Sequence, residues 1–483
     1  MKLTLRQLFF IVLFLGLFLM MLRPIADPDF WWHLRTGQLI FQTRAIPHID
    51  PYSFTKAGGV WITHEWLSEL IIYLLFKLGG YGLLIFAFSI LITGAFYFSY
   101  LRAPMKSRPY IAGFALLLGA LSTAPTWGVR PQMLSLFFAS LFLYFLDHYQ
   151  TSAKLKFILP LPLLTLLWVN LHAGYLIGLS LIAFFIIGGL TDLLLLEFQI
   201  IKHPYPSPTL RSILILCGTL AICILVTIIN PNGIKILTYP FQTLFSPSMQ
   251  QFIQEWFSPD FHQIIWLPFA FIILGLIGLG MVSKKSISPI NILLTLVFGY
   301  AALRSMRNIP FFAISVIPIL AEQVDSMIEI RTNGRTPSRM FHYLVPPLLA
   351  ILVLLTGLRF FQVARSQSQT ESDSFPKAAV DWILSNRPSG NIFNSYGWGG
   401  YLIWRAYPEY KVFIDGRADV YGDSFLYDYM TIYRSEPGWE DKLKNQGVQT
   451  VIVEPNAPLA NTLLASQSWK IVFEDKISVI FKR

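Results

Sequence analysis

The chain has 483 residues, of which 54% are hydrophobic and only 13% are charged, and its mean hydropathy is +0.55. This composition excludes both an ordinary soluble domain and a disordered chain. The net charge of +10 does not indicate nucleic-acid binding, because the lysines and arginines are spread through short loops between apolar segments. We therefore expect a protein of the lipid bilayer with no nucleic-acid partner.

Apolar stretches long enough to cross a hydrocarbon core of about 30 Å recur along most of the chain. We predict about eleven membrane helices, near residues 3–22, 82–101, 110–126, 131–148, 157–170, 174–197, 212–229, 265–283, 287–303, 309–323 and 341–361. The first stretch also has the charged start of a signal peptide. The Arg-Pro-Ile-Ala-Asp-Pro-Asp that follows is a poor cleavage site, so we expect a retained helix.

Residues 64–78 are apolar but short, and they carry Glu65, Glu69 and Lys77. We predict an amphipathic or re-entrant helix at the outer surface rather than another span. Counting this segment as a span would reverse every later loop and place the basic residues after Tyr100 outside, against the positive-inside rule.

Two kinds of loop alternate between the predicted helices. One kind is basic and otherwise plain: Arg102/Lys106/Arg108, Lys154/Lys156, Lys202/Arg211, Lys284/Lys285 and Arg331/Arg335/Arg339. The other kind carries acids, histidines, asparagines and tryptophans: Asp27/Asp29/His33, His64/Glu65, Arg130, Asn170/His172, Glu255/Trp256 and Arg304/Arg307. Since basic loops stay in the cytoplasm, we predict a bacterial inner-membrane protein whose active site and C-terminal domain are extracytoplasmic.

The first outer loop, about residues 23–81, opens with Asp27 and Asp29 at the end of the first helix. A carboxylate at the bilayer boundary is costly to desolvate, and it can act as a general base or hold a divalent cation. The alternative is that one of the two caps a helix that starts near Phe30. The sequence leaves both interpretations open.

Three further titratable groups in the same loop, His33, His64 and Glu65, favour a functional site over isolated structural histidines. His64 and Glu65 join the two aspartates as candidate catalytic residues, and His33 is a candidate substrate-binding residue. The tryptophans of this loop suit either an interfacial belt or stacking on a sugar ring: Trp31, Trp32, Trp61 and Trp66.

The remaining outer loops add single polar groups, which we take as candidate substrate-binding residues: Arg130, Asn170, His172, Glu255, Arg304 and Arg307. Arg130 precedes a helix that begins at Pro131, where the helix dipole disfavours a cation, so an anionic partner is expected. Arg304 and Arg307 break the positive-inside rule. Either a phosphate or an ion pair with Glu255 or a first-loop aspartate compensates them.

Beyond residue 370 the composition becomes that of a soluble domain. We predict a polytopic membrane domain over residues 1–365 and a small α/β domain over 373–483. The latter has a helix at 376–386 and strands at NIFN, KVFID and three later segments. Asp415 and Arg417 lie at the end of one predicted strand, where α/β sheets often bind ligands. A tight turn with an internal ion pair is the alternative.

The order of residues in the first loop resembles the GT-C membrane glycosyltransferases. It consists of an acidic pair, a glycine, a Pro and Asp, Gly-Val-Trp, a polar turn and Gly-Gly: Asp27/Asp29, Gly37, Pro47, Asp50, Gly59–Trp61, His64-Glu65 and Gly79-Gly80. This superfamily includes protein O-mannosyltransferases, aminoarabinose transferases of lipid A and oligosaccharyltransferases. The resemblance covers the first 100 residues best, and elsewhere it extends to topology only.

The resemblance implies a sugar donor on a polyprenyl phosphate, a first-loop aspartate as base or metal ligand, and basic residues that bind the lipid phosphate. Two departures matter. The family's Asp-Glu pair is Asp27-Pro28-Asp29 here, so either carboxylate can be the base. The polar turn is His-Glu rather than the Lys-Pro of the lipid A enzymes, so the glycan, lipid or protein acceptor stays undefined.

Other functions compete with a transferase that uses lipid-phosphate sugars. A polysaccharide ligase or polymerase would take lipid-diphosphate glycans. A transporter would place ionisable groups in the middle of its helices, which carry few here. A non-catalytic scaffold would tolerate loss of both first-loop aspartates.

Overall fold

The computed structural model describes residues 4–103, 109–199, 208–283, 285–328 and 339–483. Part of the predicted basic loops falls outside the described residues: Lys106, Arg108, Lys202, Lys284, Arg331 and Arg335.

Every predicted membrane segment overlaps a helix of the bundle. These helices are α1 (Leu5–Met21), α3 (Trp66–Arg102), α4 (Pro109–Thr123), α5 (Gln132–Ser152), α6 (Pro160–Leu171), α7 (Tyr175–Glu197), α8 (Leu210–Thr227), α11 (Leu267–Val282), α12 (Pro289–Arg304), α13 (Ile309–Met327) and α14 (Arg339–Ser374). Among the described residues, 7 helical stretches are long and apolar enough to cross a membrane, and three further apolar helices are shorter. The chain is an integral membrane protein, while the count of eleven spans stays a prediction.

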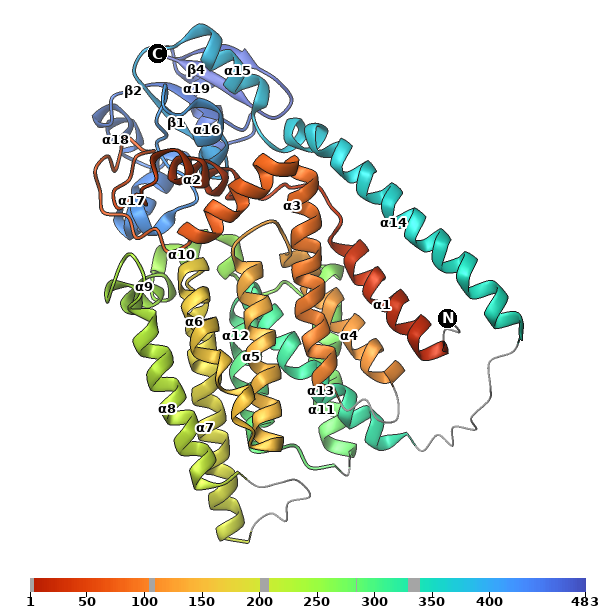
Figure 1. The fold of residues 1–483 in the computed structure, drawn as a ribbon. Coiled ribbons are helices and arrows are strands. Elements are labelled where there is room, and N and C mark those ends of the chain that lie inside the picture. Colours follow the sequence, from red (N-terminus) through yellow and green to blue (C-terminus); the bar gives the residue numbers. More distant parts are fainter. Residues whose placement is uncertain (1–3, 104–108, 200–207, 284, 329–338) are drawn as a thin grey trace.

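The predicted surface helix and the span after it form one element, α3, with a sharp kink. Gly79 and Gly80 have non-helical backbone angles, and the φ of Gly80 is +62°. A side chain at Gly80 would be strained in this left-handed conformation. In Figure 1 the first part of α3 runs obliquely across the end of the bundle, and the second part descends between the other helices.

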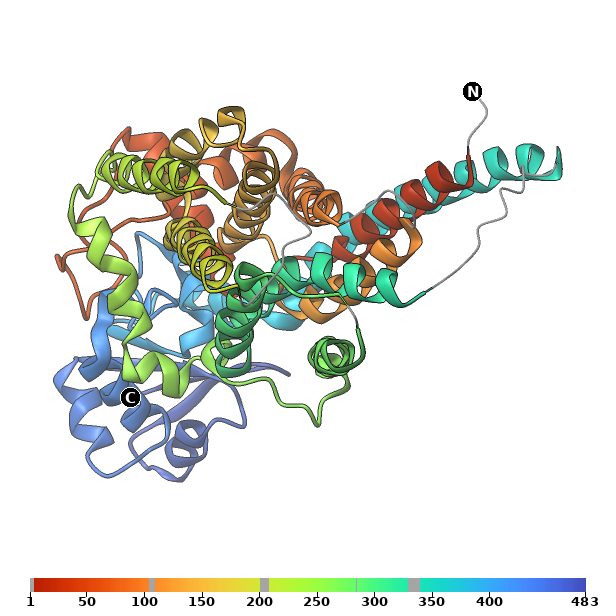
Figure 2. The same ribbon diagram turned by 90° about the horizontal axis from the view of Figure 1, so that it is seen from below.

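Three short helices fill the space between the bundle and the C-terminal domain: α2 (Phe30–Thr43), α9 (Lys235–Leu244) and α10 (Pro247–Phe252). The C-terminal ends of α3 and α5 and the start of α8 lie at the opposite end of the bundle (Figure 1), and Arg102, Lys154 and Arg211 lie in or beside them. Seen from below, α1 and α14 run side by side along one edge (Figure 2), and they are in contact. The polar loops therefore gather at the end that the C-terminal domain covers.

The C-terminal domain is the predicted small α/β unit. Its elements are α15 (Lys377–Asn386), β1 (Asn391–Asn394), α16 (Gly399–Ala406), α17 (Ala418–Tyr433), α18 (Trp439–Asn445), β2 (Val448–Val453), α19 (Pro458–Ala465), β3 (Lys470–Glu474) and β4 (Val479–Lys482). The strand order is β1-β2-β4-β3. β1 pairs in parallel with β2, and β4 is antiparallel to both of its neighbours.

The prediction of a strand at KVFID, residues 411–415, is wrong. The segment stays outside the sheet and makes an isolated bridge between Val412 and Ser53. The Val412 amide donates to the Tyr52 carbonyl at 3.0 Å, and the Phe54 amide donates to the Val412 carbonyl at 3.2 Å. The first outer loop thus takes the backbone groups that would otherwise pair within the domain.

No break separates the two predicted domains, because α14 continues to Ser374. Gln367 of this helix holds the chain just after α1. Its side-chain oxygen accepts from the Ile25 amide at 2.7 Å, and its nitrogen donates to the Ile25 carbonyl at 3.0 Å. The helix therefore anchors the C-terminal domain beside the start of the first outer loop.

A buried arginine joins the C-terminal domain to that loop. Arg417 is 2% exposed and donates to both oxygens of Asp415 at 2.8 and 2.7 Å. It also lies 2.9 Å from Asp50 of the first loop, and its guanidinium faces the Trp61 ring at 4.5 Å. The predicted ion pair within the turn is thus present, and a second carboxylate from the loop extends it.

Glycines allow the two parts to approach closely. A Cβ on Gly400 would lie 2.6 Å from the Pro28 carbonyl oxygen, and a Cβ on Gly416 would overlap the Asp29 carboxylate. The Gly-Trp-Gly-Gly turn at residues 397–400 and the Asp-Gly-Arg turn at 415–417 are therefore contact points with the first loop.

We expect Gly400→Ala to lower the stability of the folded protein by about 1–3 kcal/mol, because the added methyl group collides with backbone. Gly397→Ala is the matched control in the same turn, since its Cβ would meet no atom within 4 Å. Thermal unfolding in detergent measures both variants. Equal melting temperatures for the two would contradict the close packing at Gly400.

Candidate functional site

Asp27, Arg130 and Glu255 form a charge cluster at the end of the bundle that the C-terminal domain covers. Nη1 of Arg130 lies 3.2 Å from Oδ2 of Asp27 and donates a short hydrogen bond to Glu255. Burial would raise the pKa of Glu255, but the neighbouring Arg130 and then Arg307 outweigh it and lower this pKa. The anionic partner expected for Arg130 is thus a pair of carboxylates from two different loops.

Asp29 occupies the N-cap position of α2 but makes no side-chain capping bond. Its Oδ1 accepts from the Trp32 indole at 3.1 Å, and its backbone amide donates to Asp27 Oδ1 at 2.9 Å. Burial, followed by the charge of Asp27, raises the pKa of Asp29 to about 7. A half-buried carboxyl group that titrates near neutrality is suited to accept a proton.

The structure separates Arg307 from Arg304, which the sequence had grouped. The Arg307 guanidinium lies over the Trp256 ring at 4.5 Å, and its charge acts on Glu255. Arg304 is exposed at the end of α12 and donates to the side chain of Gln250 at 2.9 Å. Only Arg307 therefore joins the charge cluster.

Glu65 lies among three histidines. Its Oε1 is 3.3 Å from Nε2 of His172 and 3.5 Å from Nε2 of His64, and its Oε2 is 3.5 Å from Nδ1 of His33. Burial would raise the pKa of Glu65, but the charges of His64 and His33 outweigh it and lower this pKa. Glu65 is thus a buried carboxylate that orients imidazoles, and it is a poor proton acceptor.

The three histidines differ in charge state. Burial lowers the pKa of His33 to about 4 and that of His172 to about 3, so both are neutral at pH 7. The Gly174 amide donates to Nδ1 of His172 at 2.9 Å, which assigns the proton of this ring to the nitrogen facing Glu65. Burial also opposes protonation of His64, but Glu65 outweighs it and raises the pKa of His64.

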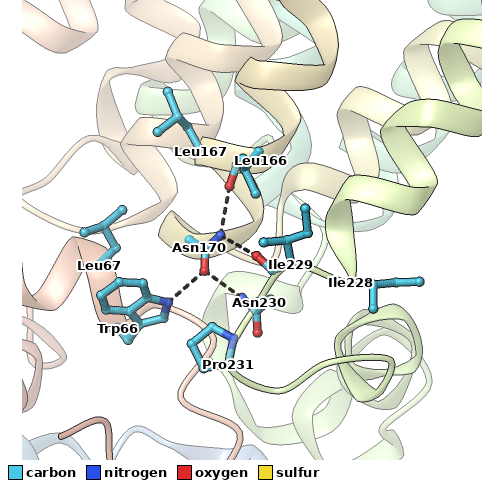
Figure 3. A pocket seen from close by; sticks show the side chains of 9 residues that line it. All are labelled: Trp66, Leu67, Leu166, Leu167, Asn170, Ile228, Ile229, Asn230 and Pro231. Atoms are coloured by element: carbon cyan, nitrogen blue, oxygen red, sulfur yellow. Dashed lines mark hydrogen bonds between the residues drawn. The ribbon is translucent and has the colours of Figure 1, made fainter.

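Asn170 is a structural clamp beside an apolar cavity of about 490 Å³ (Figure 3). Its oxygen accepts from Trp66 and Asn230 at 3.0 and 3.2 Å. Its nitrogen donates to the carbonyls of Leu166 and Ile229 at 2.9 and 3.2 Å. Both the oxygen and the nitrogen of the Asn170 amide are thus hydrogen-bonded within the protein. Through its bond to Trp66, Asn170 fixes the start of α3 next to Glu65.

A second cavity of about 210 Å³ lies between α10 and the C-terminal domain. Its lining is aromatic and polar: Phe252, Ile253, Ser395, Tyr396, Gly397, Leu426, Tyr429, Met430, Tyr433 and Glu454. The phenol of Tyr396 donates to the Gly416 carbonyl at 3.3 Å, and the charge of Asp29 contributes to its raised pKa after burial. Tyr396 therefore links the wall of the cavity to Gly416, the residue that packs against the Asp29 carboxylate.

Sequence reasoning missed several residues of this region. The ring of Tyr239 in α9 lies against that of His64 in a tilted arrangement, with centroids 4.3 Å apart, and the Tyr239 phenol is hydrogen-bonded to Asp419. Glu69 lies beside His33 at 3.5 Å. Single tyrosines and acids within amphipathic helices give no local signal, and only Asp415 and Arg417, close to Asp419 in sequence, pointed to this surface.

Among the described residues, the side chains spaced to hold a metal ion are His33, Glu65 and Glu69. Asp27, proposed from the sequence as a metal ligand together with Asp29, instead has the cationic Arg130 beside it.

No family model matches the sequence, and no curated protein matches it. Solved structures do match the fold. The crystal structure of ArnT from Cupriavidus metallidurans bound to undecaprenyl phosphate is 13% identical, with a TM-score of 0.51 over 98% of this chain and 97% of that one. The same enzyme in the apo state gives a TM-score of 0.52 at 14% identity over the same shares of both chains.

The apo oligosaccharyltransferase from Archaeoglobus fulgidus gives a TM-score of 0.52 at 14% identity, over 92% of this chain and 69% of that one. These neighbours are enzymes of the GT-C fold, and the likeness spans the membrane bundle and the C-terminal domain together. The chain therefore has the GT-C fold.

Proposed function

We propose that this chain is a membrane glycosyltransferase that moves a sugar from a polyprenyl-phosphate donor to an acceptor of the cell envelope. The observation that carries the proposal is Asp29, a half-buried carboxyl group with a pKa of about 7. The Arg130 cation acts on it, and the charges of Arg130 and Arg307 both act on the neighbouring Glu255. The fold neighbour with bound undecaprenyl phosphate supports the class of donor.

The reaction needs a base and a cation on opposite sides of the scissile bond. Asp29 takes the proton of an acceptor hydroxyl, whose oxygen attacks the anomeric carbon while the polyprenyl phosphate departs. Arg307, whose contact is the face of Trp256, still has N–H groups to donate to the phosphate oxygens. Arg130 adds a second positive charge, and Glu255 and Asp27 hold its position.

The two cavities suit the two substrates. The apolar cavity next to Trp66 is walled by Ile228 and Ile229, which are 41% and 64% exposed, and an isoprenoid chain fits that chemistry. The cavity with Tyr396 and Glu454 offers aromatic faces and a carboxylate to an acceptor rich in hydroxyl groups.

Transfer by the purified full-length protein from a panel of radiolabelled polyprenyl-phosphate sugars tests the proposal. Activity with a monophosphate donor is expected. Turnover with lipid-diphosphate glycans alone would favour a polysaccharide ligase or polymerase instead, and no turnover with any donor would favour a scaffold.

We expect Asp29→Asn to lose about 10²–10⁴-fold in kcat/KM, the usual contribution of a general base. Because the base acts in its ionised form, wild-type kcat/KM is expected to rise with pH up to about 7 and then level off. Asp27→Asn removes the neighbouring negative charge, so it lowers the pKa of Asp29 and moves this rise to lower pH. If Asp27→Asn is the inactive variant, the two roles are reversed.

Arg307→Gln is expected to raise the KM for the lipid donor by about 10-fold or more, since a charge-assisted hydrogen bond contributes about 1.5–3 kcal/mol. Arg304→Gln is the matched control, because the side chain of Arg304 is exposed and donates to Gln250. Steady-state kinetics with varied donor separates the two. Equal effects of both variants would remove Arg307 from the phosphate site.

We place the C-terminal domain and the site on the extracytoplasmic face of a bacterial inner membrane. In a background without Cys217 and Cys223, Ser468→Cys is expected to react with a membrane-impermeant maleimide in spheroplasts. Ser152→Cys is expected to react only after lysis. Both serines are exposed. Ser152 is the last residue of α5 and Ser468 lies between α19 and β3, and the bundle end of α5 is opposite to the C-terminal domain (Figure 1). The reverse labelling pattern would invert the topology.

A further inference from the structure

A buried cluster between α2 and α3 supplies neither the base nor the phosphate-binding cations of the proposed transfer. Nδ1 of His33 lies 3.5 Å from Oε2 of Glu65 and 3.5 Å from Oε1 of Glu69. The three ligand atoms lie within 4.8 Å of one another. Their side chains come from two helices, so something between them would join α2 to α3.

The cluster lacks the partners that buried polar atoms require. His33 and Glu69 are each 1% exposed, and Nδ1 of His33 and both carboxylate oxygens of Glu69 have no hydrogen-bond partner. A buried carboxylate without a partner needs either a cation or a proton. Since a second carboxylate, Glu65, lies in the same cluster, the charge to be compensated is larger still.

We propose that His33 Nδ1, Glu65 Oε2 and Glu69 Oε1 bind a divalent cation, with Zn²⁺ as the ion that best suits one imidazole and two carboxylates. Zinc–nitrogen and zinc–oxygen bonds of about 2.0–2.2 Å at a tetrahedral angle place two ligands about 3.4 Å apart, close to the 3.5 Å that separates His33 Nδ1 from each of the two carboxylates.

The surroundings of Glu65 match those of a metal ligand. While its Oε2 faces His33, its Oε1 faces His172 and His64 at 3.3 and 3.5 Å. Such hydrogen-bond donors orient a ligating carboxylate. The cation would also position the proposed base, because the His33 ring lies 3.6 Å from that of Trp32, whose indole donates to Asp29.

Metal analysis of the full-length protein, purified in detergent without chelators, tests the site and does not depend on activity. Inductively coupled plasma mass spectrometry is expected to find one zinc, or one manganese, iron or cobalt, per chain. Glu69→Gln and His33→Gln are expected to lower that content by about tenfold or more. Asp27→Asn and Glu322→Gln are the controls that keep it, since neither residue belongs to the cluster.

Wild-type protein without metal, whose melting temperature does not rise on addition of ZnCl₂ or MnCl₂, would overturn the site. So would a Glu69→Gln variant that keeps its metal, or one that is more stable than wild type, because the latter indicates a shared proton instead of a cation. If the variants fail to fold, X-ray absorption of the wild type decides. A metal ion coordinated by one imidazole and by oxygen ligands supports the site, and any other set of coordinating atoms contradicts it.

Discussion

The buried guanidinium of Arg417 is the contact on which the rest of the outer surface depends. It bonds to Asp415 of its own domain and to Asp50 of the first outer loop, and it stacks on Trp61. A buried cation of this kind is destabilising unless all its partners are present. The C-terminal domain and the first loop therefore hold each other in place.

Once the two parts are joined, glycines set how close they come. Gly400 and Gly416 bring the C-terminal domain against Pro28, Asp29 and Trp32. This contact buries Asp29, and burial is the largest cause of its raised pKa. The chemistry available at the site thus follows from the packing of a soluble domain on a membrane loop.

The charges behind this contact form two groups with different characters. Arg130 is compensated by Asp27 and Glu255 and lies next to the cation of Arg307, so this group is suited to an anionic leaving group. Glu65 and its histidines form the second group, which is more deeply buried. The first group faces substrate in the proposed mechanism, and the second fixes the helices that carry it.

The sequence by itself determined the membrane class, the approximate helix ranges, the α/β character of the C-terminal domain and the loops that carry the chemistry. Hydrophobic length and loop charge are local properties of the chain, so they can be read without coordinates.

The tertiary structure decided which polar residues meet. Arg304 and Arg307 were equivalent in sequence, and a three-residue turn sends only Arg307 to the cluster. KVFID had the pattern of a strand, but its backbone pairs with Tyr52 and Phe54. Glu69 looked like the polar face of a surface helix, yet the packing of α2 on α3 buries it beside His33. Each of these outcomes depends on residues distant in sequence, because burial and charge pairing are properties of the folded contacts and not of the local pattern.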